Sequence, residues 1–290
     1  MTQRTFDASQ WEGSGKTKGF WRSYARDWGK VCGCNALLMG VNILSFVIGI
    51  CLVMFLLPLI FTSFTPAGLK DFILESGMVE AASVTDEAVE NIFYTLCMLS
   101  SFLMIGMLLV VNGPFYSAIS FYFRNLLTGD GDFKADFKNG LKENWRKSLG
   151  ASILSIVVTV VLLFNIGYYQ RAELGTLSLA AKSFFTVLLS FWCWIQLFVY
   201  PLIACVELKF REVYRNAVIM SIKNFPVVIG VFFLQIVLFG VIPYTLMLSF
   251  GTIGYAITML LYLIFSFGFI SYVSMYITWK AIQKILQTQD

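Results

Sequence analysis

Long uncharged, apolar stretches alternate with shorter charged segments along the chain. Five stretches contain no Asp, Glu, Lys or Arg, and they lie between Lys30 and Lys70, Glu90 and Arg124, Lys147 and Arg171, Lys182 and Glu207, and Lys223 and Lys280. An α-helix rises about 1.5 Å per residue, so about 20 apolar residues cross a hydrocarbon layer of about 30 Å. The pattern therefore predicts an all-α fold built from helices that span a lipid bilayer.

The lengths of these stretches predict six membrane spans. Each of the first four holds one span, whereas the last is long enough for two spans joined by a turn at 249–254, where Gly and Ser occur together. The spans are expected near 36–60, 95–118, 148–168, 184–206, 226–247 and 255–277. They form a membrane domain over 35–280, between an N-terminal segment 1–34 and a C-terminal tail 281–290.

The basic residues predict how the spans are oriented. Of the 21 lysines and arginines, only Lys70, Arg171 and Lys182 fall in segments that face outward when the N-terminus is cytoplasmic. Cytoplasmic loops of membrane proteins carry an excess of Lys and Arg. We therefore expect a multi-pass protein of the plasma membrane with both termini in the cytoplasm. The longest outward segment, 62–92, is acidic instead.

Composition excludes an ordinary soluble domain. Hydrophobic residues make up 58% of the chain and charged residues 13%, with a mean hydropathy of +0.76, whereas soluble domains hold about 45–50% apolar and about 25% charged residues. The lipid bilayer is thus the expected partner of much of the surface. The chain has no histidine, the commonest metal ligand and the usual base near neutral pH.

Three segments have the pattern of amphipathic helices on the cytoplasmic surface. In the first, Phe20, Tyr24 and Trp28 share one helical face while Arg22 and Arg26 share another. The second, 132–147, repeats an aromatic or leucine every fourth residue beside basic residues, and the third, 210–222, is similar but weaker. Such helices anchor a protein in the headgroup region or dock a partner. The candidate interfacial or docking residues are Arg124, Phe133, Phe137, Trp145, Phe210 and Tyr214.

An internal parallel repeat is also suggested by the two inner loops. Pro114 precedes Arg124 by ten residues, and Pro201 precedes Arg211 by the same interval. Each loop then reaches the next span through an acidic or basic residue, an Asn and an aromatic residue. Repeats of this kind are common in membrane transporters.

Candidate chemistry is sparse. The segment 13–17 imitates only the end of a phosphate-binding loop, because Gln10 stands where the first glycine is needed. Cys32 and Cys34 lack further ligands for zinc. Asp132 and Asp136 lie among lysines, as in a solvated helix start. We therefore expect no catalytic residues, no cofactor, no metal site and no nucleic-acid partner.

The polar residues in the predicted spans are all uncharged, which argues against a proton-driven pump. The amides deep in apolar sequence are Asn42, Asn112, Asn165, Gln196 and Gln235. Ser148, Ser152, Ser155 and Thr159 share one face of the third span. Both groups are of the kind that ties membrane helices together, with a pore lining as the alternative for the serine face.

Three stretches resemble the YesL-like family of small bacterial membrane proteins, described as a domain of unknown function. They are Asn112 to Ala118, with its Gly113-Pro114 pair, then Phe123-Arg124-Asn125, and then 136–148, with Phe137 and Trp145. The resemblance implies a bacterial inner membrane protein associated with carbohydrate transport, because members are often encoded beside carbohydrate ABC importers. It carries over no catalytic residue, and Gly113 and Pro114 are expected to be architectural.

The leading functional hypothesis is a non-enzymatic accessory subunit that binds the permease subunits of a carbohydrate ABC importer. The alternative is a solute permease in its own right. Against direct coupling to an ATPase, Glu212 is followed by Val and Tyr rather than by the two alanines of the importer coupling helix. A membrane enzyme that uses Asp132 or Asp136 is a third, weaker hypothesis.

Overall fold

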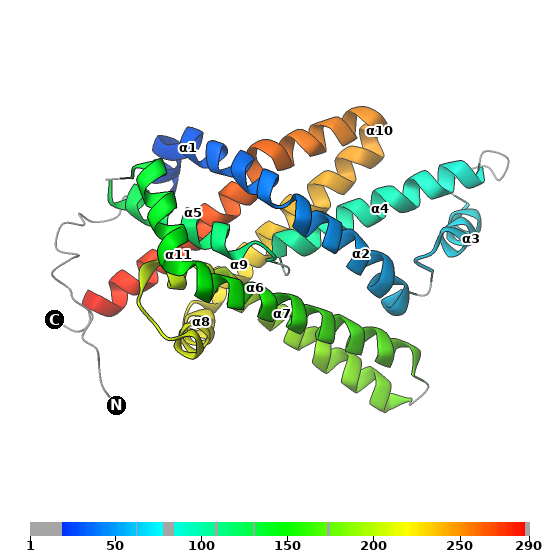
Figure 1. The fold of residues 1–290 in the computed structure, drawn as a ribbon. Helices are drawn as coiled ribbons and strands as arrows, with labels where there is room; N and C mark the ends of the chain where they lie inside the picture. Colours follow the sequence, from blue (N-terminus) through cyan, green and yellow to red (C-terminus); the bar gives the residue numbers. More distant parts are fainter. Residues whose placement is uncertain are drawn as a thin grey trace.

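A computed structural model describes residues 19–61, 63–77, 84–107, 110–129, 131–172 and 175–287 (Figure 1). All regular secondary structure in these ranges is helical, which confirms the all-α class. The helices are α1 Phe20–Val41, α2 Ile43–Ile60, α3 Pro66–Ser76, α4 Asp86–Met107, α5 Gly113–Thr128, α6 Phe133–Arg171, α7 Thr176–Cys205, α8 Phe210–Lys223, α9 Phe225–Ile236, α10 Ile242–Leu261 and α11 Phe267–Gln287. Two π-helical turns, η3 Val237–Val241 and η4 Tyr262–Ser266, flank α10. The segment 13–17 and parts of the predicted outer loop and C-terminal tail lie outside the described residues.

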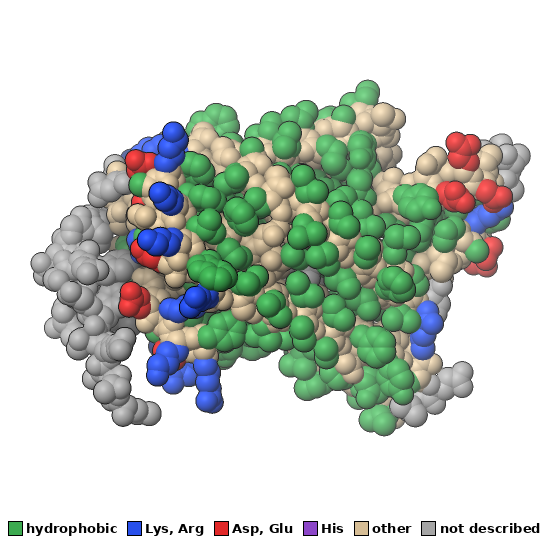
Figure 2. Space-filling model, in the orientation of Figure 1, with side chains coloured by type: hydrophobic (Ala, Val, Ile, Leu, Met, Phe, Trp, Pro, Cys, Tyr) green, Lys and Arg blue, Asp and Glu red, His purple; other side chains and the backbone are tan. Residues whose placement is uncertain are grey.

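Among the described residues, five helical stretches are long and apolar enough to cross a membrane. They are Ile43–Ile60, Asp86–Met107, Phe133–Arg171, Thr176–Cys205 and Phe225–Lys284. Figure 2 shows a broad belt of hydrophobic side chains with charged side chains of both signs at its two ends. Basic side chains predominate at the end that holds the start of α1 and the start of α6, which we call the basic end, and acidic side chains are prominent around α3 and the start of α4, which we call the acidic end. The chain is therefore a multi-pass membrane protein, with apolar helices suited to contact with a bilayer.

The last stretch is a helical hairpin rather than one rod. It covers 60 residues, and inside it Gly251 has φ 52° and ψ −124°, a conformation that only glycine adopts at low cost. Beyond this turn the chain runs back along itself, so that the Tyr262 hydroxyl donates a hydrogen bond of 2.8 Å to the Phe239 carbonyl. The turn lies within the predicted segment 249–254.

The predicted span over 95–118 differs from the structure. Helix α4 ends at Met107 and α5 begins at Gly113, with non-helical backbone at 110–112. Pro114 lies in the first turn of α5, where a proline is tolerated because that N–H has no helical partner. The same ring would clash with a preceding helical turn, so the apolar stretch divides into two helices.

The surface helix predicted over 132–147 and the third span form a single helix, α6, of 39 residues. No Gly–Pro pair separates the basic half from the apolar half, and the Asp132 side chain caps the start by accepting from the backbone of Lys134 and Ala135. The two segments compared in the predicted repeat also differ locally, because Pro201 lies inside α7 whereas Pro114 begins α5. The repeat stays a prediction.

Helix α5 lies at the centre of the molecule, packed between α6, α7, α11 and α1. Its Phe123 ring is fully buried and meets Tyr272 of α11 edge-on, with ring centroids 5.3 Å apart. A second, smaller core joins α2, α4 and α6 through Val53, Phe93 and Leu163. The larger core surrounds the candidate site described next.

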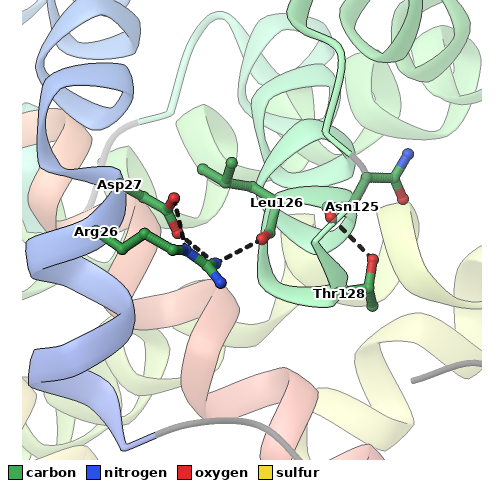
Figure 3. Close-up of polar contacts among 5 residues, drawn as sticks. All are labelled: Arg26, Asp27, Asn125, Leu126 and Thr128. Atoms are coloured by element: carbon green, nitrogen blue, oxygen red, sulfur yellow. Dashed lines mark hydrogen bonds and ion pairs between the residues drawn. The ribbon is translucent and has the colours of Figure 1, made fainter. Parts of the chain in front are cut away.

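The basic end is held by side chains that bind helix termini (Figure 3). Arg26 of α1 pairs with the buried Asp27 at 2.7 Å and donates to the Leu126 carbonyl in the last turn of α5 at 2.9 Å. The hydrogen bond to Asp27 raises the pKa of Arg26 above its ordinary value. A cation at the C-terminal end of a helix is favourable, so Arg26 fixes α1 against α5.

Candidate functional site

Four interruptions in the helices lie close together in the large core. They are the break at Asn42 between α1 and α2, the break at 110–112, and the π-helical turns η3 and η4. A break in a helix leaves backbone groups without their helical partners, and inside a membrane these groups need other partners. Buried side chains supply them here.

The first two interruptions bind each other. The Asn112 amide donates to the Val41 carbonyl and to Ser45 Oγ. Asn42 donates to the Tyr116 hydroxyl at 2.8 Å, and Ser45 donates to Asn42 Oδ1 at 3.0 Å. The two amides that the sequence marked in this region therefore join α1, α2 and α5.

The serine face of α6 holds the start of α5. Ser152 Oγ accepts from the Gly113 backbone N–H at 2.7 Å, and Ser148 donates to Ser117 Oγ at 2.7 Å. A Cβ at Gly113 would lie 2.4 Å from the Ser148 carbonyl oxygen. Only glycine allows this approach, which gives Gly113 an architectural role, as Pro114 has through its place in the first turn of α5.

The π-helical turns are stabilised in the same way. Asn35 of α1 donates to the carbonyls of Tyr262 and Leu263 and accepts from the Gly268 N–H at 2.7 Å. Gln235 donates to the Gly106 carbonyl at 3.0 Å, just before the break that follows α4. Turns of this type are frequent at functional sites.

A cavity of about 60 Å³ lies among these interruptions. Its polar lining comes from Tyr116 and Ser120 of α5, Gln196 and Tyr200 of α7, Gln235 of α9, and Ser271 and Ser274 of α11. A site for one water needs about 10–15 Å³ on this scale, so the cavity has room for a few waters. No carboxylate, amine or guanidinium is among its lining residues.

Gln196 is the most informative residue of the lining. Its side chain is 6% exposed, and neither its amide nitrogen nor its amide oxygen has a hydrogen-bond partner among the described residues. The Gln235 oxygen also lacks one. A buried polar group without a partner costs about 1–3 kcal/mol. These amides are therefore suited to a hydrogen-bonding occupant of the cavity.

Three of the candidate docking residues make contacts within the protein. Arg124 donates to the Ala204 carbonyl at 3.0 Å and lies 4.0 Å from the centre of the Phe121 ring, and its burial lowers the pKa of the guanidinium. Tyr214 stacks on Trp192 with ring centroids 5.9 Å apart. Phe137 is partly buried against Phe115 and Phe133.

The other three, Phe133, Trp145 and Phe210, are exposed at the basic end, at 40%, 46% and 37%. Trp145 begins a row of exposed apolar side chains along α6 that continues through Leu149, Ile153 and Val157. The row has helical spacing and faces away from the core, so it is the lipid-facing side of α6. Trp145 therefore has the position of an aromatic anchor at the membrane interface.

Sequence reasoning identified part of the cavity. Gln196 and Gln235 stood out as amides in apolar sequence, and the structure shows that only Gln235 ties two helices together. Tyr200, Ser271 and Ser274 were missed, because isolated hydroxyl residues are common in membrane helices and their positions follow no period.

Comparison of the chain with protein-family models, with curated proteins and with solved structures gives no match. The resemblance to the YesL-like family thus stays a prediction.

Proposed function

We propose that this protein is a permease for a small, uncharged, hydrogen-bonding solute, which binds in the cavity beside Gln196. The observation that carries the proposal is the Gln196 amide, which is buried at the cavity with neither its nitrogen nor its oxygen paired among the described residues. A solute with a donor and an acceptor would satisfy both atoms and recover the cost of burying them.

The place of the cavity supports this proposal. Gln196 lies nine residues before Cys205, the end of α7, which corresponds to about 14 Å along a helix axis or about half of a hydrocarbon layer. Irregular backbone at such depth is tolerated where it lines a cavity, and many transporters bind substrate at interrupted helices. Binding and passage need no chemical step, in keeping with a non-enzymatic protein.

The lining defines the class of solute. A charged solute would meet no counter-ion among the lining residues, and burying an unpaired charge is costly. With room for a few waters, the cavity fits a molecule of the size of urea or glycerol better than a sugar ring. Water, urea and glycerol share the required chemistry and are distinguished by measurement.

Transport by purified protein in liposomes tests the proposal. Vesicle swelling in stopped-flow light scattering gives the permeability to water, urea and glycerol in turn. We expect Gln196→Leu to lower the permeability to the transported solute about tenfold, as the loss of about 1.4 kcal/mol of binding would. Asn165→Leu is the matched control, because Asn165 is a partly exposed amide of α6 bonded within its own helix and outside the cavity. Equal permeability of protein-containing and empty vesicles to all three solutes would refute the proposal.

We further propose that the chain crosses the plasma membrane six times with its basic end in the cytoplasm. The reversal at Gly251 supports two crossings in the last stretch, and the excess of Lys and Arg supports the orientation. In a background without the six native cysteines, an impermeant maleimide added to intact cells should label Glu75→Cys on α3. Lys142→Cys on α6 should react only after permeabilisation. The opposite labelling pattern would reverse the orientation.

A second candidate function is an accessory subunit that binds the permease subunits of a carbohydrate ABC importer. The exposed Phe133 and Phe210 favour it, because they offer apolar contacts next to Lys134 and Arg211, and so does the YesL-like resemblance. Affinity purification in mild detergent should then recover importer subunits in stoichiometric amounts. The pair Phe133→Ala and Phe210→Ala should lose them, whereas Phe164→Ala, at a more exposed phenylalanine farther along α6, should retain them. Recovery of the chain alone would exclude this function.

A further inference from the structure

A second hollow lies on the side of the molecule, between α4 and α10. Its volume is about 610 Å³, within the range of about 300–1,000 Å³ typical of ligand sites. We call it the lateral groove. Thr95, Met98 and Leu99 of α4 and Met247, Leu248 and Tyr255 of α10 form its apolar walls. It is separate from the central cavity, with which it shares no lining residue.

The lateral groove is a wedge that opens toward the acidic end. Near the end of α4, beyond the residues that line the groove, α4 touches the hairpin: Gln235 binds the Gly106 carbonyl, and a Cβ at Gly106 would lie 2.6 Å from the Phe239 ring. Toward the start of α4, the Tyr255 hydroxyl reaches Met98 Sδ at 3.5 Å. Beyond this contact α4 and α10 diverge, as Figure 1 shows. Both helices belong to stretches that are suited to cross the membrane, so the groove lies at the depth of the bilayer.

The mouth of the groove is polar and acidic. Asn91 and Tyr94 contribute to its lining near the start of α4, at the acidic end. Glu87 lies one helical turn before Asn91 and on the same face of α4. Its neighbour Asp86 is neutralised by Lys70 at 2.7 Å, and the exposed Glu87 adds negative charge at the mouth.

We propose that the lateral groove holds one phospholipid from the leaflet at the acidic end, with an acyl chain between α4 and α10 and an ammonium-bearing headgroup at Glu87. The apolar walls match the acyl chain, the Asn91 amide and the Tyr94 hydroxyl match the glycerol and phosphate oxygens, and the Glu87 carboxylate matches the ammonium group. Phosphatidylethanolamine has this chemistry. An anionic lipid would be repelled by Glu87 because both carry net negative charge. A second copy of the protein in the same orientation would likewise be disfavoured in the groove, because its own acidic end would face Glu87.

Native mass spectrometry of the full-length protein tests the proposal. The protein is incubated in mild detergent with an equal mixture of phosphatidylethanolamine and phosphatidylglycerol that carry the same acyl chains. We expect one lipid to remain on each chain after dilution, with phosphatidylethanolamine favoured about fivefold. Thr95→Phe should fill the groove and abolish retention. Thr186→Phe on the exposed side of α7 is the matched control and should retain the lipid.

The variant Glu87→Gln distinguishes the contribution of the lipid headgroup to binding from that of the acyl chain. This variant should still hold one lipid but show no preference between the two headgroups, and its circular dichroism spectrum should match that of the wild type. Three results would overturn the proposal: no retained lipid, equal retention by Thr95→Phe and wild type, or a headgroup preference unchanged in Glu87→Gln. A dimer that Thr95→Phe dissociates would assign the groove to a second copy instead.

Discussion

The two ends of the molecule are built differently. At the basic end, long-range hydrogen bonds tie separate helices together: Arg26 binds Leu126, Arg124 binds Ala204, and Asn125 binds Asp136. At the acidic end α4 and α10 diverge around the lateral groove, and the polar links are exposed: Lys70 pairs with Asp86 between α3 and α4, which also pack through Leu69, and Arg171 of α6 donates to the Pro58 carbonyl. Buried hydrogen bonds to charged groups contribute more stability than exposed ion pairs. We therefore expect the basic half to be the rigid frame and the acidic half to open first.

The largest loss of stability is expected at Gly113, where α5 packs against α6 beside the helix interruptions. Gly113→Ala would place a Cβ 2.4 Å from the Ser148 carbonyl and 2.7 Å from the Tyr200 ring. Contacts this short with backbone and side chains place the cost at the upper end of the range for overpacking, about 3 kcal/mol or more, so the midpoint of thermal unfolding in detergent should fall by several degrees. Gly40→Ala is the control, because nothing lies within 4 Å of a Cβ there. An unchanged midpoint for Gly113→Ala would mean that α5 and α6 are not packed so closely.

A smaller loss of stability is expected from Arg124→Met. The substitution keeps an apolar stem but leaves the Ala204 carbonyl without its charged donor, a change of about 1.5–3 kcal/mol. Arg211→Met, at an exposed position of α8, removes the same charge and should leave the unfolding midpoint within a degree of the wild type. If the two variants unfold alike, net charge rather than the buried contact would govern stability.

The smallest effect is expected at the acidic end. Lys70→Ala removes an exposed ion pair, and salt screens such pairs strongly. Its unfolding midpoint should equal that of the wild type at high ionic strength and differ slightly at low ionic strength. A drop as large as that of Gly113→Ala would contradict the proposed difference between the two ends.

Hydrogen exchange directly tests the expected difference in rigidity between the two ends. Amides of α10 near Gly251 and of the first turns of α4 should exchange faster than those of α5, because they have fewer buried neighbours to hold them. Bound phosphatidylethanolamine should slow exchange in α4 and α10 and leave α5 unchanged. Uniform exchange along all helices would remove the distinction between a rigid and an opening end.

The sequence predicts the apolar helices well and the interruptions poorly. Runs without charge set the approximate positions of the helices, because lipid excludes ionisable groups over a known thickness. The break before Gly113 lies inside such a run, and hydropathy does not register it, although Pro114 gives a local signal. The sequence also suggests a boundary within α6 where the structure has none. Composition changes there from basic to apolar, but such a change does not by itself end a helix.

The candidate site depends on contacts that a sequence does not contain. Gln196 and Gln235 are the same residue type in similar surroundings, yet Gln235 finds the Gly106 carbonyl 129 residues away and Gln196 finds no protein partner. Which amide is paired is decided by how α4, α7 and α9 meet. The aromatic residues at 133, 137 and 145 were grouped by their period alone, and their burial against neighbouring helices separates them.

Helix α6 has a mechanical consequence. Its 39 residues form a rod of about 58 Å, almost twice the thickness of a hydrocarbon layer of about 30 Å. The cap at Asp132, the serines that hold Gly113 and the far end at Arg171 therefore lie on one uninterrupted helix. A force applied to the basic end of α6 would displace the start of α5 and the far end of α6 together, whereas the break between α4 and α5 would absorb it.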